Sequence, residues 1–212
     1  MFQALGYMMG VDFIFAIAIL LMSVVIHEVS HGFTALMLGD PTAKYAGRLT
    51  LNPLRHLDLW GSIIVPLFLV IARSPVLFGW AKPVPFNPYN LRNQKWGPGI
   101  VGIAGPASNI LVAIIFGIFI RFGASAMPPA FLQICILIVL INIVLAVFNL
   151  IPIPPLDGSK VLFSFLPYRY QGIQIFLERF GFFILLIFIF FFIHLLSPIV
   201  LGLFRLITGM GL

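Results

Sequence analysis

Long apolar stretches dominate this sequence and restrict its fold more than any other feature. Three of them, residues 11–38, 100–122 and 131–151, are long enough to cross a hydrocarbon core of roughly 30 Å as helices. A fourth apolar stretch covers residues 181–196. The helix that contains it is expected to begin a turn or two earlier, near Ile173. Only 8% of the 212 residues are charged, whereas soluble domains carry about 25%. The sequence therefore excludes a soluble globule and predicts an all-α polytopic membrane protein with about four to six transmembrane helices.

The region from residue 40 to residue 99 is the least regular part of the chain. It carries seven basic residues, Lys44, Arg48, Arg55, Arg73, Lys82, Arg92 and Lys95, which place it in the cytoplasm by the positive-inside rule. Its apolar piece, residues 60–71, is short and is interrupted by Pro66, so a re-entrant or interfacial segment is favoured over a span. Residues 45–51 and 84–87 are expected to form short strands, the second confined to a sheet edge by its prolines.

The expected layout is a single domain in the cell membrane, with the end of the first helix and the segment after the third apolar stretch meeting at the cytoplasmic side. Arg121 is the exception among the basic residues, because this layout places it on the outer side of the membrane. The tail, residues 199–212, either returns across the membrane or lies at its surface. The expected parts of the domain 1–212 are the helix 11–38, the region 40–99, the helix 100–122, the helix and following segment 131–167, and the C-terminal helices 173–212.

His27, Glu28 and His31 form an HExxH pattern inside the first apolar stretch. Residues four apart share one face of a helix, so the two imidazoles can converge on one metal ion while Glu28 reaches a metal-bound water. Two imidazoles, a carboxylate and one open position suit catalytic zinc. Polar core residues that bond neighbouring helices are the alternative, but ionisable side chains within a membrane helix are costly and mark functional sites. The pattern therefore predicts a metal site.

A third ligand is needed, and the acidic residues available beyond Glu28 and the first residues of the chain are Asp40, Asp58, Asp157 and Glu178. Asp157 follows a predicted spanning helix on its cytoplasmic side, after three closely spaced prolines. Prolines end the helix and let a carboxylate turn back into the bundle, and Gly158 permits a close approach or an unusual φ. An ordinary Asp-Gly turn beside the membrane is the alternative, but the prolines favour Asp157 as the ligand.

Two motifs together are more specific than either one alone. The HExxH pattern lies in a spanning helix, and Asn149-x-x-Pro152, followed by Leu156-Asp157-Gly158, comes much later in the chain. This pair resembles the site-2 protease family of intramembrane zinc metalloproteases. The segment Gly105-Pro106-Ala107-Ser108-Asn109 is similar to the GPxxN motif of that family, and residues 79–87 resemble a stretch common in its compact bacterial members.

The resemblance implies one zinc ion per chain, bound by His27, His31 and Asp157, with Glu28 as the catalytic base. It implies an endopeptidase that hydrolyses peptide bonds within or next to transmembrane segments of membrane protein substrates. The expected layout of the helices places its active site toward the cytoplasmic side. The resemblance also implies that Asn149 lies near the bound substrate, where an amide can hold an extended peptide or a developing oxyanion.

For the GPxxN segment, which includes Gly105 and Pro106 near the site, the expected role is structural. Asn109 is expected to hydrogen-bond the irregular backbone of the re-entrant region. Many members of the family carry a PDZ or a CBS domain. The expectation here is a compact member without either, so regulation by such modules within the same chain is not expected.

Two other functions can be built on the same residues. A metal or proton transporter could use the His/Glu/Asp cluster as a transit site, but transporters commonly repeat their sites in inverted halves, and the sequence contains no second constellation. An inactive relative that serves as a scaffold usually shows a broken HExxH pattern or lacks the third ligand, whereas this sequence has both the intact pattern and Asp157. The twelve basic residues form no continuous face for nucleic acid. The expected partners are a transmembrane protein substrate and the lipid bilayer, and a homo-oligomer is compatible with the sequence.

Overall fold

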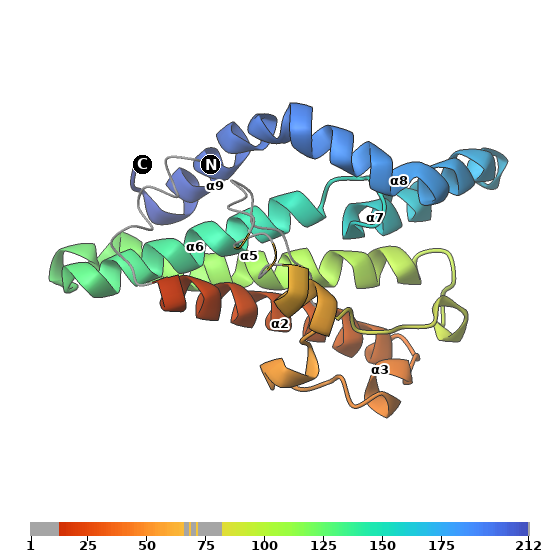
Figure 1. Ribbon diagram of the computed structural model, residues 1–212, viewed down its shortest axis with the longest axis horizontal. Helices are drawn as coiled ribbons and strands as arrows, with labels where there is room; N and C mark the ends of the chain where they lie inside the picture. Colours follow the sequence, from red (N-terminus) through yellow and green to blue (C-terminus); the bar gives the residue numbers. More distant parts are fainter. Residues whose placement is uncertain (1–12, 66–67, 69–70, 72–81, 212) are drawn as a thin grey trace.

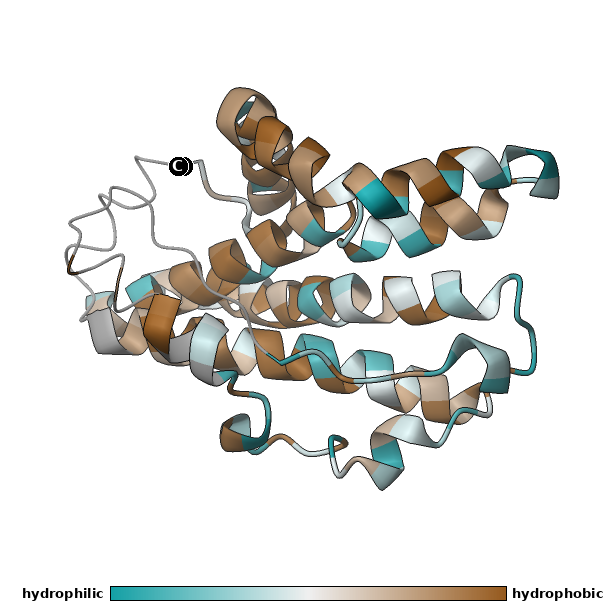
Figure 2. Cartoon of the chain, turned by 45° about the vertical axis from the view of Figure 1, so that its right-hand side comes forward, coloured by the Kyte–Doolittle hydropathy of each residue, from teal (hydrophilic) through white to brown (hydrophobic). Residues whose placement is uncertain are grey.

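The computed structural model describes residues 13–65, 68, 71 and 82–211 of the chain. These residues form an all-helical fold, which confirms the predicted fold class. Figure 2 shows that the long helices are mostly hydrophobic, and that hydrophilic residues gather on the loop before α5 (Gly97–Gly123) and at the start of α8 (Gln171–Phe192). Four segments are long and apolar enough to cross a membrane, α2 (Phe13–Met37), α5 (Gly97–Gly123), α6 (Pro129–Asn149) and a broken helix that contains α8 (Gln171–Phe192), η7 (Ile193–Leu196) and α9 (Ser197–Thr208). The shorter helices are α3 (Thr42–Tyr45), η2 (Pro53–Arg55), η3 (Leu59–Ile64), η4 (Pro88–Asn90), η5 (Ala124–Ala126), α7 (Asp157–Phe165) and η6 (Tyr168–Tyr170).

Helices α2, α5 and α6 pack against one another and form the centre of the fold (Figure 1). Small residues on α5 allow close approach, as is typical of membrane helices. A Cβ on Gly102 would lie 3.0 Å from the carbonyl oxygen of Asp157, and a Cβ on Gly99 would lie 2.5 Å from Ser164 Oγ. These glycines therefore let the short helix α7 pack directly on α5.

The chain leaves α6 at Asn149 and reaches α7 through residues 150–156. Three prolines in this connection have no backbone N–H and cannot continue the helix. A Cβ on Gly158 would overlap the carbonyl oxygen of Leu150, so this position needs glycine because of the close approach that the sequence predicted. The connection turns the chain back toward α5 and places Asp157 at the first position of α7.

The C-terminal tail forms α9, which packs against α5 and α6 and continues the broken helix along the bundle (Figure 1). Phe204 is fully buried in the cluster between these helices. Arg121 Nη1 donates a hydrogen bond to the carbonyl oxygen of Leu206 at 3.0 Å. The last carbonyl groups of a helix carry partial negative charge, so Arg121, the exception in the predicted charge distribution, is stabilised by the end of α9.

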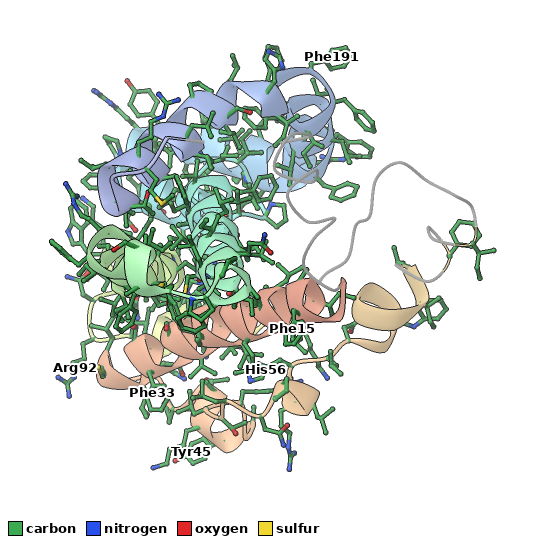
Figure 3. The ribbon with its side chains drawn as sticks, turned by 90° about the vertical axis from the view of Figure 1, so that its left-hand side faces the viewer. Phe15, Phe33, Tyr45, His56, Arg92 and Phe191 are labelled. Carbon is green, nitrogen blue, oxygen red and sulfur yellow. The ribbon has the colours of Figure 1, made fainter. Side chains whose placement is uncertain are left out.

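Helix α8 packs against the connection between α6 and α7. Leu185 packs in a cluster with Ile151 and Leu156, and a Cβ on Gly181 would lie 2.6 Å from the carbonyl oxygen of Pro154. Gly181 and Leu185 are the only buried residues of α8. Phe188 also packs against this cluster, whereas most rings of α8, such as that of Phe191 in Figure 3, are exposed and give the helix an apolar surface suited to lipid.

The two short strands expected from the sequence are not found among the described residues. Residues 84–87 have no regular secondary structure and do not pair with a strand among the described residues. The N–H of Val84 donates to Glu28 Oε2 at 2.8 Å, and the N–H of Asn87 donates to Asp40 Oδ2 at 2.6 Å. Since the neighbouring prolines have no N–H, side-chain carboxylates take the place of a strand ladder.

The other strand prediction, residues 45–51, is wrong because the chain turns after α3. Gly47 has φ +63°, which a regular strand does not allow. The apolar piece 60–71 starts in the short π-type helix η3, where Asp58 Oδ1 accepts from the N–H of Gly61 at 2.7 Å. Four of its residues, 66–67 and 69–70, lie outside the described residues, so a re-entrant segment stays a prediction.

Candidate metal centre

Three side chains from two helices converge at the centre of the fold. Asp157 Oδ2 of α7 lies 3.0 Å from Nε2 of His27 and 3.0 Å from Nε2 of His31, both on α2. The two Nε2 atoms are 3.1 Å apart, and all three residues are at most 6% exposed. The four-residue spacing puts both imidazoles on one face of α2, and the connection after α6 brings the carboxylate to them. This is the convergence that the sequence predicted.

The hydrogen bonds on the far side of each imidazole determine which nitrogen carries the proton. His31 Nδ1 lies 2.6 Å from the carbonyl oxygen of Val101, which can only accept, so this nitrogen is the donor. His27 Nδ1 lies 2.7 Å from Asn109 Oδ1 and donates in the same way. In the neutral form of both rings, each Nε2 therefore presents a lone pair toward Asp157.

This donor set fits a zinc ion. Two lone pairs and a carboxylate oxygen that face one another at 3.0–3.1 Å repel unless a cation lies between them. Ligand atoms of a tetrahedral zinc with bonds of about 2.0 Å lie about 3.3 Å apart, close to the separations found here. The three residues also form the one group of His, Cys, Asp and Glu side chains in the described part of the chain that could hold a metal.

Gly105 and Pro106 of α5 lie against this group. A Cβ on Gly105 would be 2.5 Å from His31 Nε2 and 2.7 Å from His27 Nε2. The missing side chain therefore leaves space beside both nitrogens that a methyl group would fill. Pro106 is fully buried inside the helix. The GPxxN segment thus lies where the sequence placed it, near the site.

Glu28 follows His27 on α2 and is half-buried. Its Oε2 accepts the hydrogen bond from the N–H of Val84 at 2.8 Å, which holds the carboxylate against the extended segment before α5. This contact joins residues that are far apart in the sequence, and no sequence pattern indicated it.

Five of the predicted site residues, His27, Glu28, His31, Asn149 and Asp157, line one cavity of about 140 Å³. Asn149 lies in its wall at the C-terminal end of α6, where Nδ2 donates to the carbonyl oxygen of Leu145 at 2.9 Å. The apolar part of the wall comes from the segment before α5 and from the connection after α6. The lining residues are His27, Glu28, His31, Pro83, Val84, Phe86, Asn149, Pro155, Asp157 and Lys160.

Lys160 is a site residue that the sequence analysis missed. Its Nζ lies 2.7 Å from Asp157 Oδ1 and 5.5 Å from the ring centroid of Phe86. The ammonium group of Lys160 donates to this oxygen, and its positive charge favours the ionised form of the carboxylate. The signal was the spacing, because a lysine three residues after an aspartate on a helix lies beside it.

Asn109 has different partners from those expected. Its Oδ1 accepts from His27, and its Nδ2 donates to Asn142 Oδ1 at 2.8 Å and to the carbonyl oxygen of Ser23 at 3.3 Å. Within the described residues it therefore bonds α2 and α6, and not the re-entrant region. Its position one turn after Gly105 on α5 turns it toward these two helices.

Comparisons with known proteins give consistent matches. The model for "Peptidase family M50" matches residues 118–192, a range that includes Asn149 and Asp157. "Putative zinc metalloprotease YwhC" of Bacillus subtilis (strain 168) is 36% identical over 176 residues, which cover 79% of this chain and 76% of that protein.

Two further relatives share the name "Putative zinc metalloprotease Rip2". The Mycolicibacterium smegmatis protein is 33% identical over 150 residues, and the Mycobacterium tuberculosis (strain H37Rv) protein is 28% identical over the same length. In both cases the match covers 71% of this chain and 56% of the relative, so the chain spans little more than half the length of these proteins. No solved structure matches the chain.

Proposed function

The chain belongs to peptidase family M50, and on this premise we propose that it is a zinc-dependent endopeptidase that cuts membrane proteins within or next to their transmembrane segments. The observation that carries the proposal is the convergence of His27 Nε2, His31 Nε2 and Asp157 Oδ2 in a cavity that also holds a glutamate. Helices α2, α5, α6 and α8–α9, which are apolar enough for a bilayer, support a substrate that is itself embedded in the membrane.

In this proposal His27, His31 and Asp157 bind one zinc ion. When bound, zinc supplies a Lewis acid that polarises a peptide carbonyl and makes a water molecule more acidic. The chain contributes the fixed orientation of the ligands: Val101 and Asn109 accept from the two Nδ1–H groups and keep both Nε2 lone pairs directed inward.

Glu28 acts as the general base. Its Oε2 accepts from the N–H of Val84, so the carboxylate is held in one orientation and its other oxygen, Oε1, can take the proton of the attacking water. Glu28 then returns the proton to the leaving amine. The fixed backbone donor reduces the motion that the carboxylate must make between the two steps.

The cavity also suits an unwound peptide. A transmembrane substrate has its carbonyl groups hydrogen-bonded within its own helix, so it must unwind locally before water can attack. Asn149 in the cavity wall offers an amide to the exposed peptide. The cavity is bounded by Pro83, Val84 and Phe86 of the basic region, which supports an active site toward the cytoplasmic side.

The proposal is tested by comparing wild type with Glu28→Gln and Glu178→Gln. Glu178 is an exposed glutamate on α8, bonded to Gln174 Nε2, and serves as a matched control. Each protein is expressed in a cell from which the gene for this protein has been deleted. New peptide termini in the membrane fraction are then identified by mass spectrometry. We expect new termini in or beside transmembrane segments with wild type and with Glu178→Gln, and none with Glu28→Gln, although that variant keeps its zinc. Termini that persist with Glu28→Gln contradict the proposal.

A further inference from the structure

Three buried polar side chains behind His27 form a continuous chain of hydrogen bonds across the three central helices. Asn109 of α5 donates through Nδ2 to Asn142 Oδ1 of α6 at 2.8 Å. Asn142 Nδ2 donates to Ser23 Oγ of α2 at 2.9 Å and to the carbonyl oxygen of Ile138 at 2.9 Å. Both asparagines are fully buried, and Ser23 is 4% exposed. This series of hydrogen bonds begins at the metal centre and ends in the apolar interior, where polar groups are costly.

The acceptors at the far end fix the orientation of each amide. The carbonyl oxygen of Ile138 can only accept, so Asn142 directs its NH₂ group toward it and its Oδ1 toward Asn109. Asn109 therefore directs its own NH₂ group toward Asn142 and the carbonyl oxygen of Ser23, and its Oδ1 toward His27. An oxygen at that place admits only a protonated Nδ1 on His27, which leaves the Nε2 lone pair directed at Asp157.

We propose that Asn142 is a positioning residue that, through Asn109, holds His27 in the tautomer that can bind the metal. This inference rests on the proposed function in one respect, the assignment of His27 as a zinc ligand. Asn142 itself contacts none of the three ligand residues in the hydrogen bonds of the site. Its effect on the metal centre passes through a single amide, that of Asn109.

Replacing Asn142 with leucine removes the 2.8 Å acceptor from Asn109 and leaves its NH₂ group with the carbonyl oxygen of Ser23 at 3.3 Å. The amide of Asn109 can then rotate and direct its NH₂ group toward His27 Nδ1. That arrangement favours the tautomer with the proton on Nε2, which cannot bind a metal. Loss of such an orienting contact weakens metal binding by about 10- to 100-fold.

The test uses the full chain in detergent, stripped of metal, with zinc added in competition with a chromophoric chelator. Asn142→Leu is compared with Thr208→Val, a control that removes a buried hydroxyl group outside the metal centre. Thr208 is 1% exposed on α9, and its Oγ1 donates to the carbonyl oxygen of Phe204. We expect Asn142→Leu to weaken zinc binding by about 10- to 100-fold and Thr208→Val to leave it unchanged. Equal effects of the two variants overturn the proposal.

A second background separates positioning from simple packing of the helices. In Asn109→Asp both side-chain oxygens can accept from His27 Nδ1, so the orientation of the group no longer matters. We expect Asn142→Leu to cause no further loss of zinc affinity in this background, whereas a packing role predicts the same loss as in wild type. The same loss in both backgrounds contradicts the inference.

A measurement on wild type makes the test independent of whether the variants fold and of whether zinc binds. Nitrogen-15 spectra of the four histidines in the metal-free protein, with His27 assigned by its replacement with glutamine, report the tautomer directly. We expect His27 to carry its proton on Nδ1, and a proton on Nε2 alone overturns the inference. A wild-type protein that has this tautomer but binds no zinc would instead contradict the proposed function.

Discussion

Lys160 bonds the oxygen of Asp157 that the two histidines leave free. Asp157 Oδ2 faces both imidazoles at 3.0 Å, while Oδ1 accepts from Lys160 Nζ at 2.7 Å. The carboxylate thus has separate partners for its two oxygens, and one helical turn of α7 supplies both the aspartate and the lysine. This arrangement favours binding of a metal through Oδ2 alone.

Replacing Lys160 with methionine keeps the aliphatic stem of the side chain and removes the ammonium group. We expect zinc to stay bound and peptide cleavage to fall by about tenfold, because Asp157 loses the contact that fixes its orientation. Lys160→Arg, which keeps a donor, should retain most of the activity. Metal analysis together with a cleavage assay checks the prediction, and unchanged cleavage by Lys160→Met would show that the contact has no role in orientation.

The second prediction concerns zinc binding by a variant of Gly105, and it depends on shape and not on charge. A methyl group at this position would lie 2.5–2.7 Å from both Nε2 atoms, so Gly105→Ala should displace the imidazoles and abolish stoichiometric zinc binding. Gly202→Ala is the matched control, since a Cβ there meets nothing within 4 Å, and it should bind zinc like wild type. Elemental analysis of the purified variants measures both. Zinc content that is normal in Gly105→Ala would mean that α5 does not border the metal.

Removal of a ligand gives the third prediction. Detergent-purified wild type should contain about one zinc per chain, and both His27→Ala and Asp157→Ala should contain none, because two remaining ligands bind zinc weakly. Asp58→Ala is a control in which an acidic residue is removed at the start of η3, and its zinc content should match that of wild type. Zinc that remains in Asp157→Ala would place the third ligand elsewhere.

The parts of the site that could be predicted from sequence are those fixed by local geometry. The spacing of His27 and His31 determines that they share a face of a helix, whatever packs against it. The prolines between Asn149 and Asp157 prevent α6 from continuing beyond Asn149. Both consequences follow from a few neighbouring residues, and the structure has both.

The missed contacts depend on how separate elements pack. The bond from the N–H of Val84 to Glu28 joins two segments that no local pattern relates. The partners of Asn109 depend on which side chains of α2 and α6 face it, and no local pattern indicates these. Residues 84–87 were expected to form a strand, but the acceptors that hold them are carboxylates on and just beyond α2.

Asp40 provides the last prediction, which concerns stability and pH. It is fully buried just after α2, and its carboxylate accepts from the N–H and hydroxyl of Thr42, the N–H of Asn87 and Nδ2 of Asn90. Burial alone would raise its pKa, but these hydrogen bonds outweigh burial, and the pKa of Asp40 is lowered. The ionised carboxylate therefore ties the segment before α5 to the end of α2.

Because the folded pKa is lowered, the stabilisation is present above the unfolded pKa of about 3.9 and is lost as the pH falls through the folded value. Asp40→Asn should lower the free energy of opening of residues 82–91 by about 1–3 kcal/mol near neutral pH, since an NH₂ group would then face a donor. Limited proteolysis of this segment in detergent, from neutral to acidic pH, measures the effect. Wild type should become more susceptible only in acid, and Asp40→Asn should be susceptible at every pH. Equal protection of the two proteins at neutral pH would mean that the carboxylate does not hold the segment.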